Sequence, residues 1–336
     1  MPILNPPIET LEVHSAGQPV RVVTDGIDFT HLSWESIPEL RRQFAAEFDH
    51  VRRHLNLGPR GHEDLVCSFP VTPGDERADL GLFFTDKSSY LDMCGDGTIG
   101  TISAFVRAGR LPKSDQFTVE TPIGLVDTTI TYNEENELER VSVNGIETVV
   151  VNERAVSLPV DDRVEDIAVS LVFAGHFYGL VDVTDVGLDL TADSIRVDAF
   201  RRIGTQLREK LNDRPPTNPL TGETQPVAVV LFYDERTDGP DANLIVSGDG
   251  AIGRGPCGTG TCAKMGKLFE EDRLGLDEPY PHRGPFGTEY LGRLDSSAEA
   301  ENGTVLQASV SGVGYLTGKQ SIVWHPKDEF EPTVLS

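Results

Sequence analysis

The spacing of apolar residues predicts two amphipathic helices. The first spans about 37–56, where large apolar side chains recur every three or four residues from Leu40 onward. Ser36 and Glu39 have the spacing of a capping box at the start of this stretch. Together, the spacing and the cap predict one helix that ends near Gly58.

The second helix is predicted from the same spacing between Ile195 and Leu211. Its start is expected near Asp193 or Ser194, because both residue types cap helix N-termini. Pro215 and the proline after it lie beyond its end.

Short runs rich in Val, Ile, Thr and Phe surround these helices and are bounded by Gly, Pro, Asn or Asp. Segments 211–226 and 234–242 are crowded with Gly, Pro and Asp and are predicted to be surface loops. The chain is therefore expected to be mixed α and β. The predicted strands are 19–24, 80–84, 117–120, 125–131, 167–173, 228–233, 305–310 and 321–324.

Length and charge narrow the kinds of protein that this chain can be. Its 336 residues, 38% of them apolar, are enough for about two domains, each with its own core. The 29 basic and 54 acidic side chains give a formal net charge of −25. Nucleic acids and anionic membranes require a basic surface, so both are excluded as partners. The acids are spread along the chain, which fits a halophile-like protein in a high-salt cytoplasm, although an acidic mesophilic protein fits too.

The sequence also predicts a cytoplasmic location. No stretch approaches the roughly 18 consecutive apolar residues of a membrane span, and residues 1–6 lack the regions of a signal peptide. The cysteines Cys67, Cys94, Cys257 and Cys262 are too few and too scattered for a disulfide scaffold. Reduced thiols are expected.

Two glycine-rich turns repeat the pattern C-G-x-G-T. Cys94 opens the first turn and Cys257 the second. Each turn leads into a helical segment, over about 99–108 and 262–272, that ends at a stop carrying glycine. The wide separation excludes a solenoid repeat and indicates two similar halves.

These turns predict a particular chemistry. A cysteine before a helix has a lowered thiol pKa, because the helix dipole and the unpaired first-turn amides favour the thiolate. The glycines let backbone N–H groups approach an anion such as a carboxylate. If the halves face each other, one thiolate can remove a proton from a carbon while the opposite thiol delivers one to its other face. With both helix N-termini stabilising the carbanion, a stereocentre beside a carboxylate could be inverted without a cofactor.

The same residues allow other interpretations. Cys67 and Cys262 are expected to be inert buried side chains. A zinc site is not expected, since the chain has no C-x-x-C pair and the pair Cys257 and Cys262 has no matching histidines. Both glycine turns also match a dinucleotide-binding fingerprint, with Glu120 about 20 residues after the first. No buried strand leads straight into either turn, so nucleotide binding is disfavoured.

Further short motifs cover nearly the whole chain. They read H-S-A-G-Q-P-V-R-V-V from His14, P-R-G-H from Pro59, M-C-G from Met93, E-T-P-x-G from Glu120, G-x-F from Gly175, R-x-P-C-G-T-G-T from Arg254, G-T at Gly287 and T-G at Thr317. In this set and order the sequence resembles the proline racemase family, which includes 4-hydroxyproline 2-epimerases and trans-3-hydroxyproline dehydratases. His14 and His62 lie in these motifs, and both a structural role in a turn and a catalytic role remain open for them.

The resemblance implies an α+β, diaminopimelate-epimerase-like fold. Such a fold has two pseudo-symmetric α/β domains, each a curled sheet around a central helix, with the active site in the interdomain cleft. The N-terminal domain would comprise 1–137 plus 319–336 and carry Cys94, because the C-terminal strand returns to it. The C-terminal domain would comprise 138–318 and carry Cys257.

The resemblance also implies roles for the site residues. Cys94 and Cys257 would be the two acid/base thiols of a cofactor-independent reaction, and no metal is implied. The substrate would be a small imino acid, proline or a hydroxyproline. The number of chains in the assembly stays open, a homodimer included. The amides on the substrate carboxylate would be those of Gly95, Asp96, Gly258 and Thr259.

Two positions depart from the usual pattern of the family. Asp96 replaces the histidine of M-C-G-H, and Gly253 replaces the aspartate of D-R-S-P-C. In the family these side chains hold the ring nitrogen of the substrate. We hypothesise that Asp96 supplies the carboxylate missing at position 253 and faces the substrate ammonium. It would raise the thiol pKa of Cys94 unless that ammonium neutralises it. The alternative is a solvated loop aspartate.

Cys257 favours a racemase or epimerase over a dehydratase, since family dehydratases typically carry threonine there. Epimerases tend to have histidine where this chain has Ala228, which favours an apolar ring pocket. His176 is a candidate contact for a substrate hydroxyl. The leading function is therefore inversion of the α-carbon of proline or a hydroxyproline. A trans-3-hydroxyproline dehydratase and a catalytically silent imino-acid binder remain as alternatives.

Overall fold

The chain folds into two compact units in this computed structural model, which describes residues 7–160, 163–191, 195–248, 250–301, 303–324 and 329–330. Unit 1 comprises Met1–Val143 and Gly312–Ser336, and unit 2 comprises Asn144–Ser311. These boundaries lie a few residues from those expected at 137/138 and 318/319.

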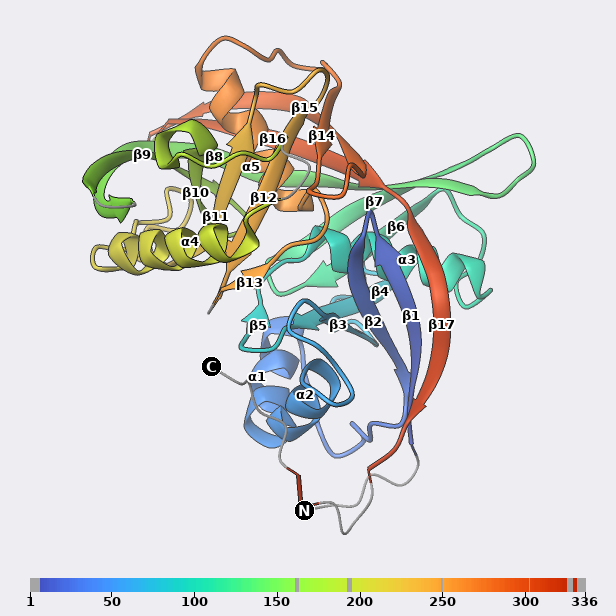
Figure 1. The fold of residues 1–336 in the computed structure, drawn as a ribbon. Helices are drawn as coiled ribbons and strands as arrows, with labels where there is room; N and C mark the ends of the chain where they lie inside the picture. Colours follow the sequence, from blue (N-terminus) through green and yellow to red (C-terminus); the bar gives the residue numbers. More distant parts are fainter. Residues whose placement is uncertain are drawn as a thin grey trace. The chain divides into compact units, whose positions relative to one another are not determined.

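Unit 1 is built on a mixed sheet to which both ends of the sequence contribute. Its strands are β1 (Ile8–Ser15), β2 (Gln18–Asp25), β3 (Val66–Val71), β4 (Leu80–Thr85), β5 (Tyr90–Leu91), β6 (Gln116–Thr121), β7 (Gly124–Tyr132) and β17 (Gly314–Ile322). β1 pairs antiparallel with β2 and β17, which run side by side in Figure 1. β2 pairs in parallel with β3, and β4 pairs in parallel with β6. β4 also pairs antiparallel with β3 and β5, and β6 with β7.

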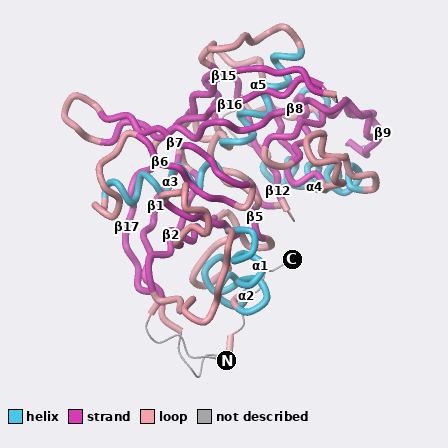
Figure 2. Tube along the Cα trace, turned by 180° about the vertical axis from the view of Figure 1, so that it is seen from behind, coloured by secondary structure: helices cyan, strands magenta, loops and turns pink. Residues whose placement is uncertain are grey.

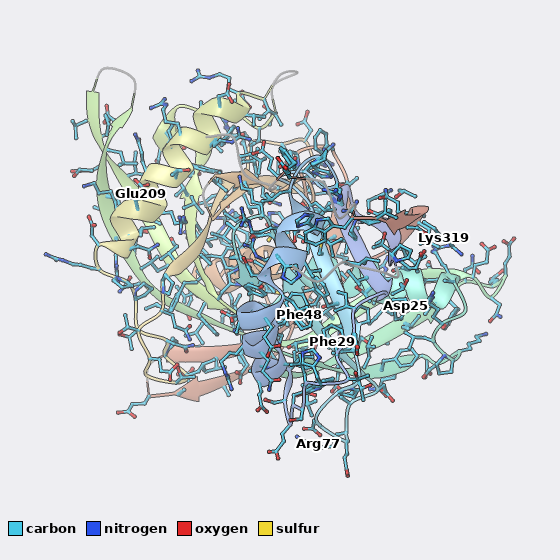
Figure 3. The ribbon with its side chains drawn as sticks, turned by 90° about the horizontal axis from the view of Figure 1, so that it is seen from below. Asp25, Phe29, Phe48, Arg77, Glu209 and Lys319 are labelled. Atoms are coloured by element: carbon cyan, nitrogen blue, oxygen red, sulfur yellow. The ribbon has the colours of Figure 1, made fainter. Side chains whose placement is uncertain are left out.

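Three helices pack on this sheet: α1 (Ile37–Glu47), α2 (Asp49–Asn56) and α3 (Gly95–Arg107). α1 and α2 lie against each other (Figure 2), and both contribute to an aromatic core. In that core the ring of Phe44 lies 5.0 Å from those of Phe69 and Phe83. Phe29 and Phe48 extend the cluster, with ring centroids 6.0 Å apart (Figure 3).

α3 is the central helix of unit 1. Its residues 95–105 are buried on every side, and it contacts β1, β2, β3 and β17. A helix that buries all its faces lies inside a fold rather than on its surface.

The predicted single helix over 37–56 is wrong, because the chain breaks at Phe48, where φ is −118° and ψ is 15°. The expected capping box does not form either. Ser36 makes no side-chain cap bond, and Glu39 instead accepts the backbone N–H of Glu35 at 2.9 Å.

Unit 2 repeats the order of strand pairings found in unit 1. Its strands are β8 (Leu138–Val160), which begins in unit 1, β9 (Arg163–Ala174), β10 (Phe177–Asp182), β11 (Val227–Asp234), β12 (Asp241–Ser247), β13 (Ala251–Ile252), β14 (Tyr280–Arg283), β15 (Glu289–Ala300) and β16 (Gly303–Gly312). β10 pairs in parallel with β11 as β2 does with β3. β12 pairs in parallel with β14 as β4 does with β6. Other pairings between described strands of unit 2, such as β8 with β9 and β15 with β16, are antiparallel. The α+β class and the expected pseudo-symmetry of the two units are therefore confirmed.

The helical segments of unit 2 are the short 3-10 helix η1 (Val183–Val186), α4 (Val197–Asn212) and α5 (Gly258–Glu270). α4 corresponds to the helix predicted over 195–211, and its apolar stripe, from Phe200 to Leu211, packs on β11 and β12. Residues 193 and 194 lie outside the described residues, but the expected start there is wrong, because the helix begins at Val197 and its N-cap residue is Arg196. α5 is the buried central helix and contacts β9, β10 and β15.

The C-terminal strand differs from its prediction. The run at 321–324 is only the end of β17, which starts at Gly314 and stops at Ile322. Within the described part of the chain, no helix combines the length and the apolar character needed to cross a membrane.

Candidate active site

Cys94 and Cys257 occupy the same place in their units, each as the N-cap residue of the central helix. The helices start directly after them, at Gly95 and Gly258, rather than at about 99 and 262 as predicted. Both cysteines are largely buried, with 9% and 7% of their surface exposed. Each first helical turn therefore presents backbone N–H groups that have no acceptor within the helix.

The second glycine of each C-G-x-G turn makes room for the thiol. A Cβ atom at Gly97 would lie 2.7 Å from Phe84 and 3.2 Å from Cys94 Sγ. A Cβ atom at Gly260 would lie 2.8 Å from Leu231 and 2.9 Å from the sulfur of its own turn. Only glycine fits between the sulfur and the sheet without displacing one of them.

The two thiols differ in their local contacts. Cys94 has an extended backbone, and its Sγ accepts the N–H of Gly97 at 3.2 Å. Cys257 makes no such bond and has φ 62° and ψ 107°, a left-handed conformation that is rare outside glycine. Such a conformation costs about 1–3 kcal/mol and persists only where the surroundings hold it.

A buried polar cluster holds Cys257 in this conformation. The backbone N–H and the hydroxyl of Thr261 both donate to the Cys257 carbonyl, at 2.8 and 2.9 Å. Asn243 donates to the carbonyl of Pro256 at 2.9 Å. His282 Nδ1 lies 3.0 Å from the Thr261 hydroxyl, and burial lowers the pKa of this fully buried imidazole to about 3, so it is neutral.

Tyr178 also contacts Cys257 directly. Its Oη lies 3.4 Å from Cys257 Sγ and 2.6 Å from Thr259 Oγ1. The side chain is 1% exposed, and burial raises its pKa well above the ordinary value. Sequence reasoning singled out the neighbouring His176, whose ring stacks on that of Tyr178 at 4.6 Å, but missed the tyrosine. His176 lies in the turn before β10, whereas Tyr178 is the second residue of that strand and meets partners about 80 residues away, which no local sequence signal indicates.

The remaining predicted residues lie as follows. Asp96 is 8% exposed in the first turn of α3, and Thr259 is 3% exposed in that of α5. A Cβ atom at Gly253 would lie 2.2 Å from Cγ1 of Ile245. An apolar side chain therefore crowds the place that an aspartate at 253 would need. Arg254 extends over the ring of Phe286, 5.2 Å from its centroid.

Several alternatives raised by the sequence find structural explanations. Cys67 and Cys262 are fully buried, and burial raises the thiol pKa of Cys67 to about 12, as expected for inert side chains. His14 accepts the N–H of Gly17 at 3.2 Å and stabilises the turn between β1 and β2.

Glu120 has a structural role instead of the nucleotide-binding role that its spacing allowed. Its carboxylate accepts three backbone N–H groups, from Ile37 at 2.9 Å, Gly74 at 2.6 Å and Asp75 at 3.0 Å. It thereby caps α1. Among the described residues, no three His, Cys, Asp or Glu side chains cluster so that they could hold a metal ion.

Comparisons with known proteins agree over nearly the whole chain. The family model described as Proline racemase matches residues 10–333. The chain is 28% identical over 328 residues to a proline racemase of Acetoanaerobium sticklandii, covering 96% of both proteins. It is also 28% identical to a trans-3-hydroxy-L-proline dehydratase of Bacillus thuringiensis subsp. konkukian, again with 96% of both covered. A solved hydroxyproline epimerase from Agrobacterium vitis with bound trans-4-OH-L-proline has a TM-score of 0.87 and 21% identity, covering 99% of this chain and 97% of that one.

Proposed function

Because the chain belongs to the proline racemase family, we propose that it is a cofactor-independent isomerase that inverts the α-carbon of proline or a hydroxyproline. The observation that carries this proposal is the matched placement of Cys94 and Cys257 at the N-termini of two buried helices. Sequence identity alone does not distinguish a racemase from a dehydratase, since the chain is 28% identical to one of each.

The proposed reaction uses the two thiols in opposite states. One cysteine, as thiolate, removes the α-hydrogen, and the other, as thiol, delivers a proton to the opposite face of the carbon. When the substrate has the other configuration, the roles are exchanged. Each cysteine must therefore be stable both with and without its proton.

The first-turn amides are the proposed seat of the substrate carboxylate. Gly95 and Asp96 begin α3, and Gly258 and Thr259 begin α5, where N–H groups point beyond the helix. Negative charge that moves from the α-carbon into the carboxylate would be stabilised by these donors.

Asp96 is the proposed partner of the substrate ammonium. Its burial supports this role over that of a solvated loop aspartate. The crowding of Gly253 by Ile245 supports it further, because a carboxylate cannot stand at position 253 without displacing that side chain. His176 is kept as the proposed contact of a ring hydroxyl.

The thiol mechanism also supports a cytoplasmic location, since catalytic cysteines must remain reduced and the cytosol keeps them so. The net charge of −25 supports a high-salt cytoplasm, where ions screen the repulsion between acids.

Hydrogen exchange at the α-carbon tests the proposal. L-proline and trans-4-hydroxy-L-proline are incubated in deuterated water and followed by NMR and polarimetry. We expect the inverted product to carry deuterium from the start while the remaining substrate stays protonated, as two separate bases require. Cys94→Ser and Cys257→Ser should abolish inversion, and Cys67→Ala, which changes a buried thiol outside the site, should retain it.

Two other outcomes would contradict the proposal. Loss of water from trans-3-hydroxy-L-proline, without inversion of the other substrates, would identify a dehydratase. Thermal stabilisation by an imino acid, with neither exchange nor inversion, would identify the silent binder.

A further inference from the structure

The phenol of Tyr178 bridges Cys257 and Thr259 inside unit 2. Its Oη is 3.4 Å from the sulfur and 2.6 Å from the threonine oxygen, and either atom of each pair can be the donor. The thiol and the two hydroxyls each carry one hydrogen that can rotate. The same heavy-atom positions therefore allow the hydrogen bonds to run in either direction.

We propose that Tyr178 is a positioning residue that stabilises Cys257 in both of its protonation states by reversing this chain of hydrogen bonds. The inference rests on the proposed function, because a two-base reaction needs both states. When Cys257 is a thiol, its S–H donates to Tyr178, whose O–H donates to Thr259. When it is a thiolate, Thr259 donates to Tyr178, whose O–H donates to the sulfur. Only the two O–H bonds rotate, so no covalent bond forms or breaks and the phenol keeps its proton.

The surroundings of Tyr178 suit this role. It is 1% exposed, so water competes little for its hydrogen bonds. Burial, followed by the neighbouring Cys257, raises the pKa of the phenol well above its ordinary value, which keeps the phenol neutral while the thiol titrates.

Unit 1 lacks this arrangement at the corresponding place. The hairpins β1–β2 and β9–β10 both turn at a glycine with positive φ, Gly17 and Gly175. Three residues later, unit 1 has Val20 where unit 2 has Tyr178. The sulfur of Cys94 instead accepts a backbone N–H, a donor whose direction is fixed. At the position that corresponds to Tyr178, unit 1 therefore has no side-chain hydroxyl that could bond reversibly to Cys94.

The test measures the pH dependence of alkylation of Cys257 by iodoacetamide in a Cys94→Ala background, with peptide mass spectrometry as the readout. Only the thiolate reacts, so the midpoint reports the thiol pKa without any turnover. Adding Tyr178→Phe removes the donor to the thiolate at nearly constant volume. We expect the midpoint to rise by about one pH unit, because the bond lost by the charged thiolate is stronger than the bond lost by the neutral thiol.

Two controls separate this effect from a general loosening. In a Cys257→Ala background, Tyr178→Phe should leave the midpoint of Cys94 unchanged. Tyr280→Phe removes another buried tyrosine hydroxyl bond of unit 2, to Asp241 at 2.8 Å, and should not move the midpoint of Cys257. An unchanged Cys257 midpoint in Tyr178→Phe, or equal shifts at both cysteines, would overturn the proposal.

A second measurement leaves Tyr178 in place and serves if Tyr178→Phe does not fold. The S–H stretching band of Cys257 is obtained as the infrared difference between Cys94→Ala and Cys94→Ala/Cys257→Ala. We expect the lowered frequency of a donating thiol, and the frequency of a free thiol would refute the proposal. Neither the alkylation midpoint nor the S–H band requires turnover, so both can be measured even if the chain inverts no imino acid. Failure of the proposed function is detected separately, in the exchange assay.

Discussion

The side-chain amide of Asn243 on β12 donates to the carbonyl oxygen of Pro256, 2.9 Å away, and so fixes the residue before Cys257. The same amide donates to the carbonyl of Arg283 on β14 at 3.0 Å. One buried side chain thus connects two strands to the turn that carries a proposed catalytic thiol. We expect the left-handed backbone of Cys257 to depend on this connection, because nothing in the residue type itself favours that conformation.

Asn243→Ala is expected to affect both stability and catalysis. It leaves the buried Pro256 carbonyl without this donor, so the free energy of unfolding should fall by about 2 kcal/mol. The α-hydrogen exchange rate should fall at least about tenfold as Cys257 relaxes, since a small misplacement of a reacting group is costly. Urea unfolding followed by circular dichroism and the exchange assay measure the two effects. The control is Asn212→Ala, which loses bonds to Val227 and should lower stability without changing exchange. A stability loss with normal exchange in Asn243→Ala would contradict the argument.

The ion pair of Lys264 and Glu235 predicts an asymmetry between two substitutions. Lys264 on α5 is fully buried, whereas Glu235 is 26% exposed and is also paired with Arg273 at 2.9 Å. Glu235→Gln should cost about 3 kcal/mol of unfolding free energy, because it leaves a buried ammonium without its carboxylate. Lys264→Met leaves Glu235 paired with Arg273 and should lower the free energy of unfolding by less than about 1 kcal/mol. Equal losses in urea unfolding would refute the asymmetry.

The contribution of Glu235 to the free energy of unfolding should also depend on pH. Burial alone would raise the pKa of this carboxyl, but hydrogen bonds from Arg273 and Lys264 outweigh it and lower the pKa to about 2. Because the pKa in the folded state is lower than the unfolded value of about 4.3, Glu235 stabilises the fold fully at pH values above about 4.3. This stabilisation is lost as the pH falls through the folded-state pKa. The stability difference between the unsubstituted chain and Glu235→Gln should therefore be constant from about pH 7 to 5 and shrink between about pH 4 and 2.

The glycines beside the two sulfurs give a further prediction. Gly97→Ala and Gly260→Ala should each lower the exchange rate by about 10²-fold, because the new methyl group displaces the sulfur or the sheet side chain behind it. Gly318→Ala on β17 is the matched control, since a Cβ atom there meets nothing within 4 Å. Normal exchange in both active-site variants would show that the thiols tolerate displacement.

The features that the sequence could predict are those determined by neighbouring residues. The C-G-x-G-T turns place each cysteine at a helix start because a glycine must lie against the sulfur, and this requirement is local. The cap supplied by Glu120 could not be predicted, because that side chain reaches Ile37 from a strand 83 residues later in the chain. The break at Phe48 could not be predicted either, because the apolar spacing continues through it to Leu55. The role of Tyr178 could not be predicted for the same reason as the cap, since its partners are about 80 residues away.

The dispersed acidic charge predicts a dependence of stability on salt. Acidic side chains such as Asp25 and Glu209 are exposed on both units (Figure 3). Their mutual repulsion weakens as ions shorten the screening length from about 10 Å at 0.1 M to about 3 Å at 1 M. We expect the melting temperature to rise between 0.1 and 1 M KCl, in calorimetry at pH 7. A flat or falling melting temperature would indicate that the charge does not limit stability.

The last prediction concerns Asp96 and the crowding of Gly253 by Ile245. If Asp96 holds the substrate ammonium, Asp96→Asn should lower kcat/KM by about 10- to 100-fold, chiefly through KM, as for loss of a hydrogen bond to a charged group. A carboxylate at position 253 could compensate, but a Cβ atom there would lie 2.2 Å from Cγ1 of Ile245. Gly253→Asp in the Asp96→Asn background should therefore fail to restore kcat/KM, whereas Gly253→Asp together with Ile245→Ala should recover at least about tenfold. Steady-state kinetics with L-proline measures all three variants, and unfolding curves exclude loss of the fold. An Asp96→Asn variant with normal kcat/KM would instead make Asp96 a loop residue without contact to the substrate.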